Sequence, residues 1–185
     1  MPALSLQAWS HEAQHDLSAS IRCHLQALKI AEETKSLTGL IATAGSLVQL
    51  YALQEDAEQA NRMFEQAIQL AEQHQIADLP LLGFAYIGMG RLCYQQRQWD
   101  EAEGYLKEAI TRSQRWGGLS LEVVKAYLLL AQVLRSAGKA KQAHSTLAQA
   151  KHYITQQQLP NWVTTWFETP PPIATPIAKE TARLI

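Results

Sequence analysis

The chain of 185 residues lacks several features that mark particular classes of protein. Its two cysteines, Cys23 and Cys93, are too few and too far apart for a disulfide framework or a C-x-x-C pair. It has no long run of one charge, since 16 Lys and Arg balance 17 Asp and Glu, so nothing draws it to nucleic acid or anionic lipid. It also lacks a signal-peptide core and an apolar run that could span a bilayer. These absences predict a cytoplasmic protein with no direct nucleic-acid or membrane contact.

What the sequence does contain is a repeated helical pattern. Four related segments begin at residues 20, 60, 102 and 143, about 40 residues apart. Three columns recur on one predicted helix face, and two of them hold small residues. The columns are Ser20, Ala60, Ala102 and Ala143; His24, Phe64, Leu106 and Leu147; and Ala27, Ala67, Ala109 and Ala150. Small residues next to one large residue favour a closely packed helical hairpin.

Each of the last three segments follows an apolar, helix-periodic partner, and a short polar turn separates the two. Between hairpins, TKSLTG (34–39) and WGGLS (116–120) carry glycines, which we expect to end helices in the left-handed conformation, and hydroxyl residues that start the next helix. A period near 40 with this content predicts an all-α, right-handed α-α superhelix, a TPR-like solenoid. The expected hairpins are about 1–35, 37–75, 79–116 and 120–158, with a capping helix at 159–168 and a Pro-rich tail at 169–185.

The columns resemble tetratricopeptide repeats, and residues 90–117 and 126–150 resemble the long-period repeats of MalT-like, LuxR-family bacterial transcriptional regulators. The resemblance covers roughly residues 36–158 and is most specific at Gly90 with Tyr94, and at Tyr127 with Gly138. It implies an inducer-sensing array between a nucleotide-binding module and a DNA-binding domain. The chain has no G-x-x-x-x-G-K-[ST] phosphate loop, and its proline-rich tail has no room for a DNA-binding domain. ATP hydrolysis and DNA contact therefore do not carry over.

Residues 11–15 read HEAQH and match the H-E-x-x-H pattern of zinc peptidases. In the repeat register, however, His11 takes the place of Tyr51, and His15 falls beside a predicted turn. No third ligand follows at a suitable spacing. We therefore interpret the motif as a polar turn in a degenerate first repeat, with zinc catalysis as a remote alternative, and we expect no enzyme activity, no metal and no cofactor.

The two ends of the array differ in their predicted covering. The first repeat begins mid-unit, so Leu4, Leu6 and Trp9 are expected to be partly uncovered. Either an upstream part of a larger regulator is missing, or this edge docks on another protein or on a second copy as a homodimer. At the other end, Trp162 and Trp166 are expected to cover the last hairpin, together with Phe167.

A ligand would sit on the concave side, which the first helix of each hairpin lines in this class of repeat. Polar residues interrupt apolar runs there, and a buried polar group without a partner costs roughly 1–3 kcal/mol. The candidate residues on this face are Trp9, Gln49, Arg91, Tyr94, Gln95, Gln132 and Arg135. Amide, guanidinium and phenol groups suit a protein or peptide, or a small-molecule inducer that carries hydroxyl or carboxylate groups. The alternative interpretation is an ordinary solvated helix flank.

Together these observations predict a non-catalytic binding module that senses a ligand or docks a protein, either within a MalT-like regulator or as a stand-alone relative. A homo-oligomerising scaffold is the alternative.

Overall fold

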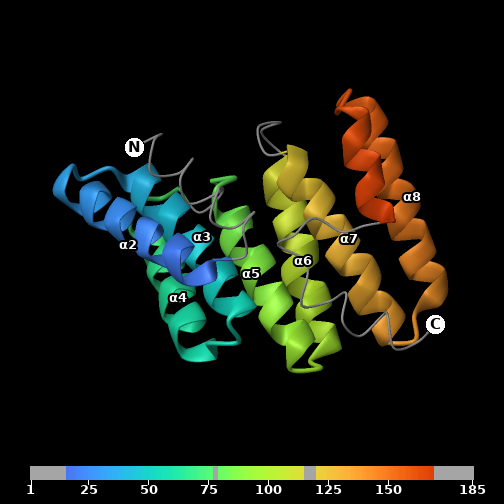
Figure 1. Cartoon of the computed structure of the whole chain (residues 1–185), viewed down its shortest axis with the longest axis horizontal. Coiled ribbons are helices and arrows are strands. Elements are labelled where there is room, and N and C mark those ends of the chain that lie inside the picture. Colours follow the sequence, from blue (N-terminus) through green and yellow to red (C-terminus); the bar gives the residue numbers. More distant parts are fainter. Residues whose placement is uncertain (1–15, 77–78, 115–119, 169–185) are drawn as a thin grey trace.

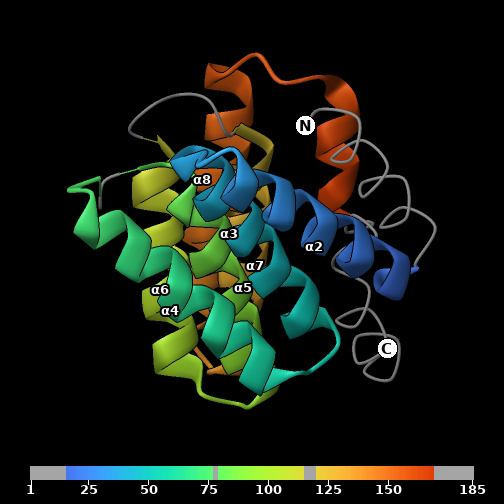
Figure 2. The ribbon, with the colours of Figure 1, turned by 90° about the vertical axis from the view of Figure 1, so that its left-hand side faces the viewer.

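The computed structural model of the chain describes residues 16–76, 79–114 and 120–168. These residues form α2 (Leu17–Glu33), α3 (Leu37–Leu53), α4 (Ala57–Gln73), α5 (Leu82–Gln95), α6 (Trp99–Gln114), α7 (Ser120–Ser136), α8 (Ala140–Gln156) and the 3₁₀ helix η1 (Asn161–Phe167). The helices run across the molecule from α2 at one end to α8 at the other (Figure 1). Viewed from the α2 end, successive hairpins lie behind one another (Figure 2). The predicted all-α helical repeat fold is confirmed.

The turn between α2 and α3 and the turn between α3 and α4 are short because, in each, one residue both ends a helix and starts the next. The Ser36 amide donates to the Ala31 carbonyl at 2.9 Å, which closes α2, and the Ser36 hydroxyl then accepts from the Gly39 amide at 3.3 Å. Asp56 repeats the arrangement between α3 and α4, since its amide donates to the Tyr51 carbonyl and its carboxylate accepts from the Gln59 amide. These pairs of bonds satisfy helix-end groups that would otherwise lack partners.

At six helix ends in the described part of the chain, the second residue after the helix adopts the left-handed conformation, with φ between 51° and 76°. These residues are Lys35, Glu55, Gln75, Arg97, Gly138 and Gln158. The expectation that Gly39 would serve in this way is wrong, because Gly39 lies inside α3 and Lys35 takes the strained position. Five of the six described positions thus carry a side chain where glycine is favoured.

The predicted columns of small residues lie in the core. Ala60, Ala102 and Ala143 are buried, and so are Ala67, Ala109 and Ala150 in the other column. The middle column is mixed, since His24 and Leu106 are buried whereas Phe64 and Leu147 are half-buried. Small residues let the second helix of each hairpin approach its neighbours closely, and this holds the repeats in register.

The C-terminal cap is built differently from the prediction. Val163 of η1 is fully buried and contacts the core, with Trp166 and Phe167 packed partly against it. Trp162 is 53% exposed and lies against Trp166, with ring centroids 5.6 Å apart. The expectation that Trp162 covers the last hairpin is therefore wrong, because in the 3₁₀ helix it is Val163 that points inward.

Candidate functional site

The first helices of the hairpins are spaced unevenly, and this spacing creates the candidate site. Helix α5 packs closely along α3, whereas it makes little contact with α7, which packs against α6 instead. Glycine permits the close α3–α5 approach, since a Cβ on Gly88 would lie 2.7 Å from Val48 Cγ1 and one on Gly45 would lie 3.0 Å from Phe84 Cβ. The layer of first helices is therefore tight between α3 and α5 and loose between α5 and α7.

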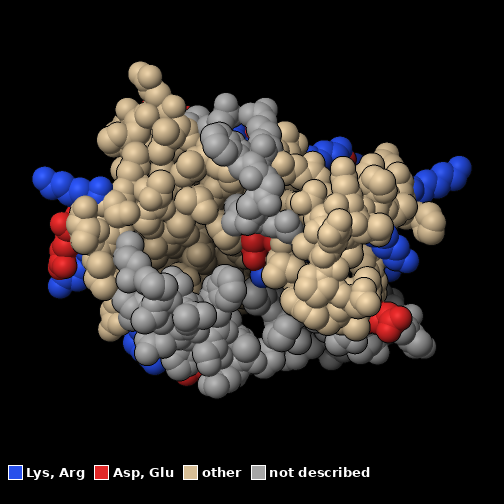
Figure 3. Space-filling view, turned by 90° about the horizontal axis from the view of Figure 1, so that it is seen from above, with Lys and Arg blue, Asp and Glu red and all other residues tan. Residues whose placement is uncertain are grey.

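Two charged side chains, Arg91 of α5 and Glu122 of α7, lie near each other at the loose joint, since the Glu122 carboxylate acts on the Arg91 guanidinium. Arg91 and Gln95 lie one turn apart on α5, and Glu122 lies in the first turn of α7. Arg91 is 6% exposed and Glu122 is 8% exposed, which is unusual for charged side chains. We call these three residues the joint cluster. In the space-filling view from above, uncharged residues make up most of the described surface, and most of the Lys, Arg, Asp and Glu atoms that show lie toward its two ends (Figure 3).

The joint cluster holds polar atoms without hydrogen-bond partners in the part of the chain that the structure describes. These atoms are Arg91 Nη1, Gln95 Nε2, Gln95 Oε1 and Glu122 Oε2. The other carboxylate oxygen of Glu122 accepts from Lys125 Nζ at 2.7 Å. Buried polar groups in folded proteins are nearly always hydrogen-bonded, so each unpaired one needs an explanation.

The electrostatics of the joint follow from burial. Burial lowers the pKa of Arg91 to about 10, and the nearby Glu122 carboxylate opposes this shift. The guanidinium therefore remains protonated at neutral pH. Its Nη1 can donate hydrogen bonds but accept none, whereas Glu122 Oε2 accepts and the Gln95 amide does both. The joint cluster can bind a polar molecule, and it holds no nucleophile paired with a base.

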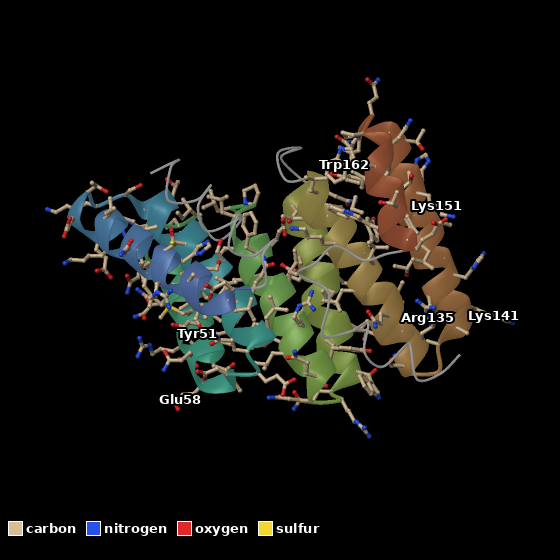
Figure 4. The ribbon with its side chains drawn as sticks, viewed as in Figure 1. Tyr51, Glu58, Arg135, Lys141, Lys151 and Trp162 are labelled. Atoms are coloured by element: carbon tan, nitrogen blue, oxygen red, sulfur yellow. The ribbon has the colours of Figure 1, made fainter. Side chains whose placement is uncertain are left out.

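The remaining residues predicted to form the site lie at different depths. Gln49 of α3 is buried, Gln132 of α7 is half-buried, and Arg135 is exposed near the C-terminal end of α7 (Figure 4). Tyr94 is buried in the core, where its ring lies 5.4 Å from that of Trp99. Its hydroxyl lies 3.5 Å from Ser136 Oγ. Their role in binding stays a prediction.

Sequence reasoning missed Glu122. The repeat register that aligns Arg91 with Gln132 also aligns Glu122 with Leu81, so a charged residue replaces an apolar one in that column. That replacement was the available signal. It is weak because an acidic residue in the first turn of a helix ordinarily interacts with the helix dipole.

Several predicted features fall outside the described residues. Trp9, Leu4 and Leu6 lie in residues 1–15, as does the HEAQH motif, and the Pro-rich tail lies in 169–185. Among the residues that are described, no group of three or more His, Cys, Asp or Glu side chains could hold a metal ion. No described helix is long and apolar enough to cross a membrane.

A hollow of about 340 Å³ is lined by residues of α6, α7 and α8. Tyr127 of α7 lines it, and the Tyr127 hydroxyl accepts a hydrogen bond from Gln114 Nε2 at 3.0 Å. The α8 wall consists of the exposed residues Ser145, Ala148, Gln149, His152 and Gln156. None of its lining residues is Asp, Glu, Lys or Arg, so this hollow offers less to a charged ligand than the joint cluster does.

Comparisons with known proteins agree with the architecture. A family model described as the MalT-like TPR region matches residues 1–169. A search of curated proteins returned no significant match. Among solved structures, the crystal structure of BtubC (BKLC) from P. vanneervenii is similar, with a TM-score of 0.63 and 16% identity. The alignment covers 85% of this chain and 64% of that one, so the chain spans less than two thirds of that protein, and the likeness concerns the fold alone.

Proposed function

Because the chain belongs to the family of MalT-like TPR regions, we propose that it is a non-catalytic sensor module that binds a small molecule at the joint cluster. The observation that carries this proposal is the buried guanidinium of Arg91, whose Nη1 has no partner among the described residues. An unpaired buried donor costs stability, and such groups persist where binding uses them. The family supports placement of the module in a regulator of transcription or in a stand-alone relative of that array.

The position of the joint cluster suits a sensor. It lies where α5 and α7 make little direct contact, so a ligand that contacts both helices would add interactions between two adjacent hairpins. A ligand shifts an equilibrium only as far as its affinity for the two states differs. A ligand bound at this joint would stabilise one relative orientation of the two hairpins over others. A partner module could then bind preferentially to that orientation.

A thermal-shift screen tests this proposal. The purified chain is screened against organic acids, amino acids, short peptides, oligosaccharides and nucleotides, alongside Arg91→Met and Arg62→Met. Arg62 is an exposed arginine of α4 and provides the matched control. A ligand stabilises only a protein that binds it, so we expect at least one compound to raise the melting temperature of wild type and Arg62→Met but not of Arg91→Met.

Two outcomes would overturn the proposal. In one, no compound shifts the wild-type chain. In the other, every shift survives in Arg91→Met. Either result would favour docking of a protein over binding of a small molecule, and the same repeat class also permits docking.

A further inference from the structure

We infer that the ligand of the joint cluster is a small carboxylate that also carries an amino or hydroxyl donor. This inference rests on the proposed function and adds the chemical class of the ligand. It follows from what each unpaired atom can accept or donate, and from the charge that the cluster leaves uncompensated.

The first requirement comes from Arg91. Its guanidinium is buried, and Nη1 donates to no described group. No carboxylate oxygen of the described chain lies within ion-pair distance of it, since Glu122 affects it only through its field. A planar guanidinium matches the two oxygens of a carboxylate, and such charge-assisted bonds are roughly twice as strong as neutral ones. The ligand therefore needs an anionic acceptor.

The second requirement comes from Glu122. Lys125 Nζ already binds one of its oxygens at 2.7 Å, and the unpaired Oε2 can only accept. A ligand group that faces Oε2 must therefore donate a hydrogen bond. An ammonium or a hydroxyl fits, whereas a second carboxylate or a phosphate oxygen would be repelled.

The third requirement comes from charge. Lys125 neutralises Glu122, so the positive charge of Arg91 is the one left without a partner. A neutral sugar would leave that buried charge uncompensated, and a purely cationic ligand would be repelled by it. Gln95 lies one turn from Arg91 on α5, and its amide, with both of its atoms unpaired, can accept from and donate to a ligand bound at Arg91. A carboxylate with a neighbouring donor meets all three demands.

Isothermal titration calorimetry with three probes of similar size tests the inference. Propionate carries only the carboxylate, lactate adds a hydroxyl and L-alanine adds an ammonium. We expect lactate or alanine to bind wild type about tenfold more tightly than propionate, because one added hydrogen bond to a charged acceptor contributes about 1.4 kcal/mol. If the natural donor is an ammonium, alanine binds best, and if it is a hydroxyl, lactate does.

Variants assign the contacts. Arg91→Lys keeps the charge but loses the planar fork, so it should weaken all three probes about tenfold. Glu122→Gln should remove the advantage of alanine or lactate over propionate and leave propionate itself nearly unchanged. Gln95→Leu is a second, uncharged change on the same helix and should weaken the two donor-bearing probes. Circular dichroism of each variant checks that it is folded.

The outcomes separate this inference from the proposed function. Equal affinity for the three probes, or no measurable binding of any of them, would overturn the ligand class, and so would tighter binding of inorganic phosphate or of glucose. If a neutral or cationic compound then gives a thermal shift that depends on Arg91, the proposed function stands without the inference. If no compound depends on Arg91, both fail.

Discussion

Arg91 of α5 and Glu122 of α7 are buried at the same joint, and Glu122 favours the charged form of Arg91, yet the two form no ion pair with each other. Arg91 Nη1 and Glu122 Oε2 both lack a hydrogen-bond partner within the described ranges. Packing alone would place apolar side chains here, as it does between α3 and α5. We expect these unpaired buried groups to cost stability, and this expectation is the physical basis for proposing a binding site at the joint.

The close α3–α5 approach predicts a large effect of Gly88→Ala. A Cβ at this position would lie 2.7 Å from Val48 Cγ1 and 2.8 Å from the Gln49 amide nitrogen, so the helices must move apart. We expect the free energy of unfolding to fall by about 1–3 kcal/mol, as for other overpacked cores. Urea unfolding followed by circular dichroism measures it.

Gly104→Ala is the matched control. Gly104 lies on α6, and nothing lies within 4 Å of a Cβ placed there. Alanine favours a helix interior over glycine by about 0.5–1 kcal/mol, so this variant should be more stable than wild type. A loss of stability in Gly104→Ala, or no loss in Gly88→Ala, would contradict the account of the α3–α5 contact.

The residues with positive φ at the helix ends predict opposite effects of two substitutions on the free energy of unfolding. Glu55 has φ 62° and Gly138 has φ 76°, and both stand at the turn inside a hairpin. Glu55→Gly should raise the free energy of unfolding by about 0.5–1 kcal/mol, because glycine adopts this conformation without steric cost. Gly138→Ala should lower it by about 1 kcal/mol. Chemical denaturation of both variants checks the sign, and equal signs would refute it.

His24 predicts a pH dependence of stability. Burial lowers its pKa, although the hydrogen bond between Nδ1 and the Ser20 carbonyl, at 3.0 Å, opposes this shift. The folded state therefore resists protonation of His24, whereas the unfolded chain takes up the proton near the ordinary pKa of about 6.5. Its contribution to stability is complete above that pH and is lost as the pH falls through it toward the folded-state pKa.

Urea unfolding at about pH 7.5 and about pH 5.5 measures this effect. Wild type should lose stability at the lower pH, and His24→Leu should lose less, because leucine does not titrate. Leucine suits this position, since Leu106 and Leu147 occupy the same repeat column. His144→Gln changes an exposed histidine of α8 and should behave as wild type does. If the pH dependence of His24→Leu equals that of wild type, burial of His24 is not its source.

Much of the fold could be predicted from the sequence, because the repeat columns carry small residues at helical spacing and packing then follows. Arg91 stood out as a polar residue inside an apolar pattern. Glu122, on the other side of the joint, left only a weak signal in the sequence, because its burial follows from how α7 packs in the folded chain. The packing of α7 against its neighbours is a property of the tertiary structure and leaves no local pattern in the sequence. The inward position of Val163 in place of Trp162 depends similarly on the 3₁₀ geometry of η1.

The melting temperature of Arg91→Met without any ligand tests the central claim most directly. Methionine keeps most of the side-chain volume and removes an unpaired buried charge, while Glu122 keeps its bond to Lys125. If Arg91 serves binding at the expense of stability, the variant should melt at or above the wild-type temperature, with a shift of about 2–4 °C for each kcal/mol gained. A melting temperature lower by about 3 °C or more would show that Arg91 stabilises the fold, and would contradict the claim.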